Sequence, residues 1–429
     1  MLEQNKLLHI EVAVKPSCLV PLPKIKELWQ VFCSSDFNSE GLMDGNEVNL
    51  DKLPQEIQQS CAKASIVDDS NEISHFAAGD SFTIHIFVLS QEESCTEELE
   101  PEGGDGEWVS GADSLTIPHA SLENLWESLI FEEGLKRQLL DYAQSALLFS
   151  DKMVSSTIVN WNRILLLHGL PGTGKTSLCR ALTHKLGIRL SGRFPRATLL
   201  EIRSHSLFSK WFSTSGKLVS TLFQMVKDMV LDDPDALVCV LIDEVESLAA
   251  SRDSSSGGDP GDAMRAVNSL LTSLDKLKPF PNVLVMATTN LHLTGSVDAA
   301  FVDRCDLLLQ VKMPPVKARY RIFMSCILEL ARVGILEIGE GDNSYFMPYH
   351  EDQSSRQSNK LSSKLLACAT SAEGLSGRSL RRLPLQAHAK YLGKYQLQVV
   401  SCIEFLEALS NAIDDEQKAR REMKRGKED

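Results

Sequence analysis

The chain lacks three features that mark large classes of protein. It contains no run of roughly 18 apolar residues and no signal-peptide pattern after Met1, so we expect neither a membrane-spanning helix nor secretion. Its 10 cysteines include no Cys-x-x-Cys pair, which favours reduced intracellular thiols over disulfides or zinc sites. It also lacks an excess of positive charge, since the formal net charge is −14, so no overall attraction draws it to nucleic acid or anionic membranes. These absences predict a protein of the nucleus or the cytoplasm.

The most informative pattern that is present is a glycine-rich segment, Gly-Leu-Pro-Gly-Thr-Gly-Lys-Thr at residues 169–176. An apolar run precedes it and a helix-like stretch follows it, which predicts a strand, a turn and a helix N-terminus. Such a turn directs backbone N–H groups at a phosphate, Lys175 adds a positive charge, and the Thr176 hydroxyl is suited to ligate Mg²⁺. We therefore expect a site for ATP and Mg²⁺ made by Gly169, Leu170, Pro171, Gly172, Thr173, Gly174, Lys175, Thr176 and Ser177.

Two further apolar runs end in polar residues that suit phosphoryl transfer. Residues 236–244 indicate a buried parallel strand that ends in Asp243 and Glu244. Asp243 would hold Mg²⁺ through water and Glu244 would polarise the attacking water; alternatively, the two acids only cap a helix. The run at 282–290 ends in Asn290, which would hold the water and the γ-phosphate, or would simply form a turn.

In this order, the phosphate loop, the Asp-Glu strand and the Thr-Thr-Asn strand resemble those of AAA+ ATPases, and the chain resembles in particular the pachytene checkpoint family, also called thyroid receptor-interacting ATPases. The segments that carry the resemblance are 161–169, 204–213, 242–248, 300–304 and 373–378. It is dense from about Ser121 to Leu409 and weak before that. The resemblance implies an α/β fold with a parallel AAA+ sheet covered by helices on both faces, a small helical lid domain and an N-terminal α+β module.

The pattern along the chain predicts four regions. Residues 1–90 alternate strand-like runs with polar turns and indicate an α+β module, which by the resemblance binds substrate or adaptor. Residues 91–118 are rich in acids, Gly and Pro, which predicts a solvated acidic linker or a long loop. Residues 119–312 would form the large ATPase domain and residues 313–429 the helical lid, with a polar insertion at 339–360. The basic end of the chain is either a solvated helical end or a signal for localisation or nucleic acid.

A segment with two adjacent aromatics lies between the phosphate-loop helix and the Asp-Glu strand. In residues 208–216, Ser, Thr and Gly border Lys210, Trp211 and Phe212. Neighbouring side chains on a regular element point in different directions, so we expect one of the two aromatics to be exposed. The resemblance places them at the central pore of a ring, where aromatics grip an extended polypeptide; alternatively, both aromatics are core residues of a helix. Residues 251–262 would form a second pore loop, because their Ser- and Gly-rich composition demands an irregular backbone.

Two arginines match positions that act on the nucleotide in the family. Arg378 matches the sensor arginine of the lid, and Arg304 matches the arginine finger that reaches the ATP of the neighbouring subunit. Asp306 stands where many AAA+ relatives carry a second arginine, and either arginine is alternatively a surface ion-pair partner. By the same resemblance Ile130 and Phe131 line the adenine, and the alternative is that they are plain core positions of a helix.

The resemblance implies a homohexameric Mg²⁺-ATPase that partially unfolds HORMA-domain proteins through a central pore, with a HORMA-type adaptor bound to the N-terminal module. Such an enzyme acts on meiotic chromosome axes, recombination and checkpoint signalling in the nucleus, and no membrane or direct nucleic-acid partner is expected. One alternative is an AAA+ enzyme that acts on nucleic acid, as a clamp loader or helicase does, and another is a scaffold that ATP merely assembles. The acidic chain and the aromatic pore segment argue against the first, and the full set of ATPase residues argues against the second.

Overall fold

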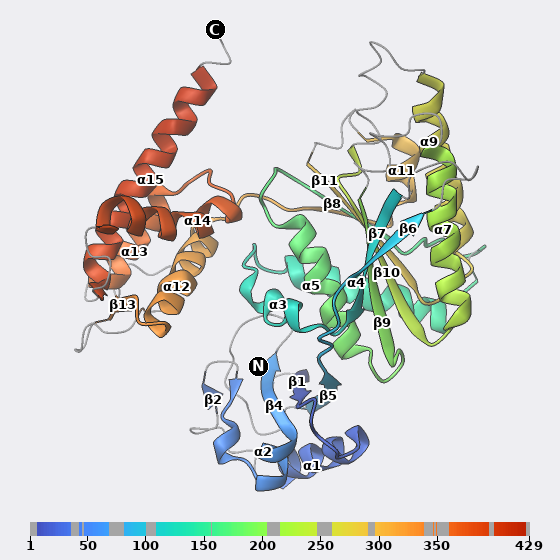
Figure 1. Ribbon diagram of the computed structural model, residues 1–429, viewed down its shortest axis with the longest axis horizontal. Helices are drawn as coiled ribbons and strands as arrows, with labels where there is room; N and C mark the ends of the chain where they lie inside the picture. Colours follow the sequence, from blue (N-terminus) through green and yellow to red (C-terminus); the bar gives the residue numbers. More distant parts are fainter. Residues whose placement is uncertain are drawn as a thin grey trace, which may run out of the picture. The chain divides into compact units, whose positions relative to one another are not determined.

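The computed structural model describes most of the chain, which folds as two compact units (Figure 1). The described residues are 7–35, 43–44, 47–67, 81–99, 109–155, 157–203, 215–246, 260–290, 297–338, 346, 349, 360–393 and 399–425. The first unit comprises residues 1–126, 133–168 and 176–309, and the second comprises residues 127–132, 169–175 and 310–429. The phosphate loop therefore belongs to the same unit as the C-terminal helices.

A seven-stranded sheet forms the centre of the ATPase fold. Its strand order is β12-β8-β11-β10-β9-β7-β6. The central strands β8 (Ile164–His168), β11 (Val283–Thr289), β10 (Ala236–Asp243) and β9 (Arg196–Arg203) are parallel neighbours, and β12 (Leu307–Gln310) borders β8. These strands are nearly continuous apolar runs because helices cover both of their faces. The expected parallel AAA+ sheet is confirmed.

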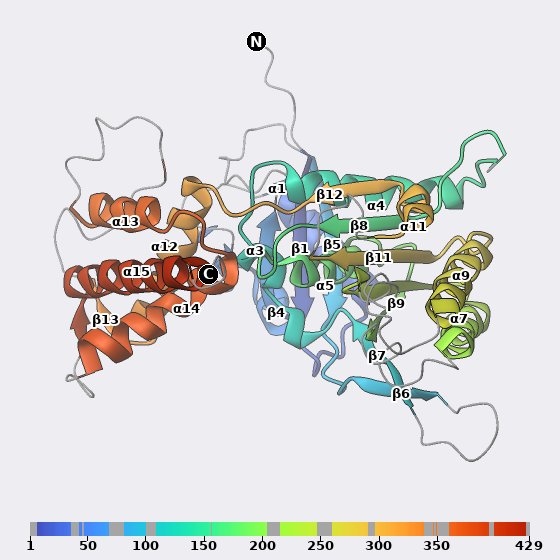
Figure 2. The same cartoon turned by 90° about the horizontal axis from the view of Figure 1, so that it is seen from above.

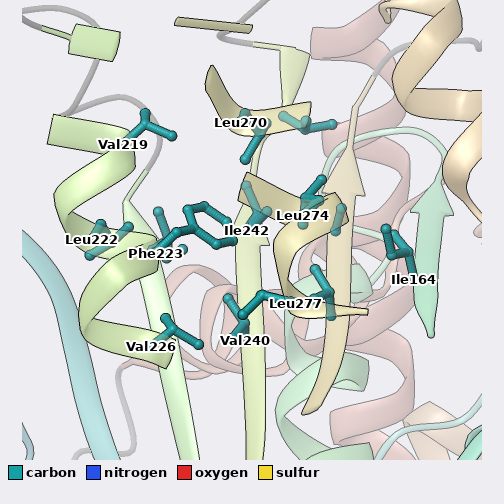
Figure 3. Close-up of a cluster of buried hydrophobic side chains, with 14 of the residues drawn as sticks. Ile164, Val219, Leu222, Phe223, Val226, Val240, Ile242, Leu270, Leu274 and Leu277 are labelled. Atoms are coloured by element: carbon teal, nitrogen blue, oxygen red, sulfur yellow. The ribbon is translucent and has the colours of Figure 1, made fainter. Parts of the chain in front are cut away.

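Two long helices bury one face of this sheet. Helix α7 (Ser215–Asp232) and helix α9 (Pro260–Leu277) direct their apolar sides at β10 (Figure 3). The side chains that meet there are Val219, Leu222, Phe223 and Val226 from α7, Leu270, Leu274 and Leu277 from α9, and Val240 and Ile242 from β10. Helix α5 (Lys175–Arg189), which follows the phosphate loop, lies on the other side of the sheet, where Thr183 bonds with Cys239 (Figure 1).

The predicted linker at 91–118 is wrong, because this segment contains two strands of the same sheet. Strand β7 (Val109–Ile117) pairs antiparallel with β9, and β6 (Cys95–Leu99) pairs antiparallel with β7 at the sheet edge. Antiparallel edge strands need only one buried face, and acidic side chains on the other face discourage pairing with a further chain. In β7, Ala112 packs into the core with α7 on one face and Ile117 lies against Gly187 of α5 on the other, whereas the acid and glycine content alone suggested a linker.

The N-terminal module has its own mixed sheet, in the order β2-β3-β4-β1-β5. Strand β1 (Leu7–Val14) pairs antiparallel with β4 (Cys61–Val67) and parallel with β5 (Ser81–Val88), and β2 (Met43–Asp44) and β3 (Glu47–Val48) extend the edge. Helices α1 (Leu22–Ser35) and α2 (Gln55–Ser60) complete the module, whose core contains the fully buried Trp29. The expected N-terminal α+β module is confirmed.

A buried polar cluster joins this module to helix α5. The Glu11 carboxylate of β1 accepts hydrogen bonds from Lys185 Nζ at 2.7 Å and from Arg189 Nε at 3.3 Å. Beside it, His9 Nδ1 and His85 Nε2 lie 2.9 Å apart and the two rings stack. Burial alone would raise the pKa of Glu11, but Lys185 and Arg189 outweigh it and lower this pKa to about 2. The cluster thus pairs buried positive charges on helix α5, which follows the phosphate loop, with a carboxylate of the N-terminal module.

The second unit contains the expected helical lid. Its helices are α12 (Val316–Arg332), α13 (Lys360–Ser371), α14 (Gly377–Ala387) and α15 (Cys402–Arg425), with the π-helical turn His388–Leu392 and the short pair β13 (Leu336–Glu337) and β14 (Val400–Ser401) (Figures 1 and 2). Their apolar sides share one core that includes Phe323, Leu380 and Phe405. The basic end belongs to α15, where Arg420 bonds to Glu416 and to Ser379. None of the helices in the described part of the chain is long and apolar enough to cross a membrane.

Candidate ATPase site

The phosphate loop lies between β8 and α5 and packs against the start of α14. Gly172 has φ +77°, and a Cβ built there would lie 2.8 Å from Ser376 Oγ, so only glycine fits this turn. The Arg378 backbone N–H donates to the Gly172 carbonyl at 3.1 Å. Thr173 Oγ1 closes the turn by donating to the Leu170 carbonyl at 2.9 Å, while Leu170 and Pro171 stay exposed. This loop has the geometry of a phosphate cradle.

Lys175 lies inside that loop as its positive charge. The residue is 4% exposed, and Nζ donates to the carbonyl oxygens of Gly169 at 2.8 Å and Leu170 at 3.0 Å. The loop therefore holds the ammonium group at the N-terminus of α5, where the helix dipole also favours an anion. Since a buried cation needs a negative partner or strong acceptors, these residues fit a bound phosphate group.

The hydroxyl and the carboxylate that were predicted to serve Mg²⁺ are brought together in the first unit. Thr176 Oγ1, on α5, donates to Asp243 Oδ1 at 2.7 Å, at the carboxyl end of β10. Thr288, on the neighbouring strand β11, also donates from Oγ1 to this oxygen. Hydroxyl and carboxylate oxygens are the ligands that Mg²⁺ prefers, so the pair fits this ion. Thr288 was not predicted, although the polar end of its apolar strand was a signal for it.

Glu244 adopts a backbone conformation that is uncommon for a residue with a side chain. Its φ is +54°, in the left-handed region, and its N–H donates to Thr288 Oγ1 at 3.1 Å. The exposed Glu244 carboxylate accepts a hydrogen bond from Asn290 Nδ2 at 3.3 Å. Asn290 is in turn held through its own N–H, which donates to Glu246 at 2.9 Å. The two predicted residues meet at the edge of the sheet, and strain of this kind is typical of functional sites.

The residues proposed to line the adenine lie in the second unit with the phosphate loop. The Phe131 ring packs 3.4 Å from the position that a Cβ would take on Gly174. Ile130 borders a cavity of about 730 Å³, whose apolar wall is completed by Leu330, Ile335, Pro384 and Leu385. Ile130 also packs against the hydrophobic core of the lid. Its position therefore fits both expectations, that of a residue lining the adenine and that of a plain core residue. The cavity is large enough for an adenine ring, and this role stays a prediction.

The two arginines differ in their surroundings. Arg378 is exposed at the start of α14, where its backbone N–H bonds to the phosphate loop. Arg304, the last residue of α11 (Ala299–Arg304), pairs with Asp275 of α9 through two of its nitrogens. Hydrogen bonds from Arg304 lower the pKa of Asp275, and the same bonds raise the pKa of Arg304. Asp275 was not predicted from the sequence, because nothing local relates it to Arg304.

Asp306 anchors the start of strand β8. Its carboxylate accepts hydrogen bonds from the backbone N–H of Asn162 at 2.7 Å and of Arg163 at 2.6 Å, and from Tyr142 Oη at 2.7 Å. Burial and this carboxylate raise the pKa of Tyr142. An arginine here would leave those buried donors unpaired, so the departure from the common AAA+ pattern reflects a local structural requirement.

The predicted pore residues Lys210, Trp211 and Phe212 lie outside the described residues, and so do most of residues 251–262, of which only the last few are described, at the start of α9. Ser177, the last predicted residue of the nucleotide site, is half-buried on α5.

Family comparisons agree with this geometry. Residues 165–313 match the ATPase family associated with various cellular activities, and residues 315–417 match the TRIP13-like AAA+ ATPase lid C-terminal domain. The pachytene checkpoint protein 2 homolog of Homo sapiens is 44% identical over 365 residues, which is 83% of this chain and 80% of that protein. The homolog of Arabidopsis thaliana is 47% identical over 326 residues, covering 73% of this chain and 68% of the relative.

Solved structures extend the likeness to the whole fold. The structure of C. elegans PCH-2 covers 96% of this chain and is itself covered completely, with 29% identity and a TM-score of 0.78. A structure of an E. coli MS115-1 HORMA:CdnC:Trip13 complex covers 69% of this chain and 93% of the matched chain, with 16% identity and a TM-score of 0.51, and so shares the fold.

Proposed function

We propose, from the premise that this chain belongs to the pachytene checkpoint protein 2 and TRIP13-like family of AAA+ ATPases and is an ATP hydrolase, that it works as a homohexamer which partially unfolds HORMA-domain proteins. The observation that carries the proposal is the lid. The ATPase core is common to many AAA+ proteins, whereas the match at 315–417 is specific to this family. The HORMA protein in the complex of a structural neighbour points to the same substrate class.

Hydrolysis rests on residues at the carboxyl ends of the central strands β10 and β11 and on residues of the phosphate loop. Bound Mg²⁺ would be held by Thr176 and Asp243, and it supplies positive charge to the β- and γ-phosphates. Lys175 binds phosphate oxygens, and Glu244, oriented by Asn290, accepts a hydrogen bond from the attacking water and aligns it. Arg378 and, from the neighbouring subunit, Arg304 would add positive charge as negative charge shifts in the transition state.

The energy of hydrolysis would move a polypeptide through the pore of the ring. Trp211 and Phe212 offer large apolar contact area that does not depend on the sequence of the threaded chain, and Lys210 adds one charge. A HORMA-type adaptor would bind the N-terminal module and present the substrate. The setting would be meiotic chromosome axes and checkpoint complexes in the nucleus, in agreement with the name of the relatives.

The decisive experiment measures ATPase rate with different stimulants. Wild type and Trp211→Ala are compared alone, with a HORMA-domain protein plus adaptor, and with DNA, and release of the peptide bound by the HORMA protein is followed in parallel. We expect the protein substrate to stimulate wild type and Trp211→Ala to lose both stimulation and release while it keeps the basal rate. Met423→Ala, at a 70% exposed position on α15, is the matched control and should behave as wild type.

Two outcomes would reject the proposal. Stimulation by DNA, with indifference to Trp211→Ala, would favour the nucleic-acid enzyme. If Glu244→Gln, which should bind but not hydrolyse ATP, still released the peptide, ATP would only assemble a scaffold. Sedimentation of Glu244→Gln with ATP tests the hexamer separately, because ATP-bound subunits should form the ring.

A further inference from the structure

The backbone of Arg304 is fixed from two sides. Asp298 caps the start of helix α11, since its carboxylate accepts from the N–H of Ala300 at 2.8 Å, and Phe301 anchors the helix in the core at 1% exposure. After the helix, the Arg304 carbonyl accepts from Asn162 Nδ2 at 2.8 Å. The position of this arginine on the surface is therefore set by the fold, independently of its own side chain.

The guanidinium group is fixed as well. Nε donates to Asp275 Oδ1 at 3.1 Å, Nη2 donates to Asp275 Oδ2 at 2.9 Å, and Nη1 donates to the Ala300 carbonyl at 2.9 Å. A guanidinium has five N–H donors, so these three bonds leave two N–H groups with no partner among the residues that the structure describes. The Arg304 side chain is 28% exposed, so those donors can reach a group outside the subunit.

The pair contributes little to the fold. Asp275 is 40% exposed, and an ion pair that water reaches adds little stability because the charges are screened and both side chains lose freedom. Helix α9 is already held by the buried Leu274 and Leu277, and α11 by Phe301. A two-bond contact that the fold does not need for stability is well explained by a need for one fixed arginine conformation.

We propose that Asp275 is a positioning residue which holds Arg304 in the conformation that reaches the ATP of the neighbouring subunit. This inference rests on the proposed ring and on the finger role of Arg304. An arginine that is free to rotate must lose that freedom in the transition state, and this loss of entropy raises the activation free energy. An arginine that Asp275 already holds has lost the freedom beforehand, so its activation free energy is lower and hydrolysis is faster.

Asp275→Asn tests the proposal, since it keeps the shape and removes the charge. We expect kcat to fall about tenfold or more, with KM for ATP and the unfolding midpoint nearly unchanged, because misplaced catalytic groups cost up to roughly a hundredfold in rate. Asp275→Glu, which keeps the charge on a longer stem, should recover part of the rate. Lys278→Ala is the matched control, because it removes the other cation near Asp275, at 3.7 Å, and should leave kcat unchanged.

Mixed rings separate positioning in trans from local damage. Glu244→Gln subunits have an inactive site but an intact Arg304–Asp275 pair, whereas Asp275→Asn subunits have an intact site. Mixing them should raise the rate per intact site at least to the level that a mixture of Glu244→Gln with Arg304→Ala reaches, because both mixtures supply the same intact Arg304. A mixture that falls short of that reference, or an Asp275→Asn variant with an unchanged or raised kcat, overturns the proposal.

The Arg304→Ala variant tells the two levels apart. Loss of about a thousandfold or more in rate is expected for a finger in trans. If Arg304→Ala is inactive while Asp275→Asn is fully active, only the positioning role is wrong. If Arg304→Ala keeps the wild-type rate, the finger role fails and the inference about Asp275 fails with it.

Discussion

Among the carboxylates of the first unit that pair with arginine, Glu11 and Asp275 differ strongly in how much water reaches them. Glu11 is 5% exposed, and its partners Lys185 and Arg189 are both 2% exposed. Asp275 is 40% exposed and Arg304 is 28% exposed. The first group joins the N-terminal module to helix α5, whereas the second lies at the end of a surface helix. The same chemistry therefore serves two different purposes in one fold.

Burial explains the difference. In the Glu11 cluster each charge depends on the others, because an unpaired charge without water is very unfavourable. Such a group can only be structural, since releasing Arg189 to a ligand would strand Glu11. The Asp275–Arg304 pair faces water, so the remaining N–H donors of Arg304 can contact another subunit while the pair stays formed. An accessible ion pair with defined geometry is thus a better candidate for function than a buried one.

The largest expected effect follows from breaking the buried cluster. Glu11→Gln leaves Lys185 and Arg189 buried without their carboxylate, which should lower the free energy of unfolding by about 3–5 kcal/mol. Denaturant unfolding, with the N-terminal Trp29 as reporter, measures it. The control is Glu329→Gln in the exposed pair with Arg332, which should leave the unfolding midpoint nearly unchanged. A small loss for Glu11→Gln would mean that water enters the cluster. The Glu11 cluster would then not differ from the exposed Asp275–Arg304 pair in its effect on stability.

A second effect concerns pH. Burial, followed by the neighbouring His9, lowers the pKa of His85 from 6.5 to about 4, so the unfolded chain takes up this proton more readily than the folded one. The contribution of neutral His85 to the free energy of unfolding should be fully present above pH 6.5, and about 3 kcal/mol of it should be lost as the pH falls from 6.5 to 4. Glu11, with its pKa lowered from 4.5 to about 2, should add a further loss between those two values. His85→Phe should flatten the upper window, and a profile as steep as that of the wild type would contradict the assignment.

The smallest effect on stability is expected at the exposed pair. Asp275→Asn should change the free energy of unfolding by less than about 1 kcal/mol, although it lowers kcat. The same unfolding experiment measures it beside Glu11→Gln. A loss as large as that of Glu11→Gln would show that Asp275 supports the fold. The exposed pair and the buried cluster would then not differ in their contribution to stability.

The sequence predicted the ATPase core well because its signals are local. The glycine spacing of the phosphate loop, the apolar run before Asp243 and the polar end after Thr288 each depend on a few consecutive residues. Buried parallel strands also share a strong pattern, since both faces are apolar. For these reasons the buried strand before Asp243 and the meeting of Thr176 with Asp243 could be expected from motifs alone.

Other parts escaped because their partners are distant in the chain. Strands β6 and β7 carry acids and glycine, and they become strands only because β7 pairs with β9 and β6 pairs with β7. Lys185 and Arg189 resemble solvated positions of a surface helix until β1 covers them with Glu11. Asp275 lies 29 residues before Arg304, and no motif links them.

The sequence by itself determined the chemistry of this protein, namely a phosphate loop, a pair of acids and a family of ATPases, because those residues act through short spacing and through the backbone next to them. The tertiary structure decided which charges are buried and which face water. It assigned Glu11 to the fold, Asp306 to the start of β8 and Asp275 to Arg304, because solvent exclusion and pairing across the sheet arise only when segments far apart in the chain pack together.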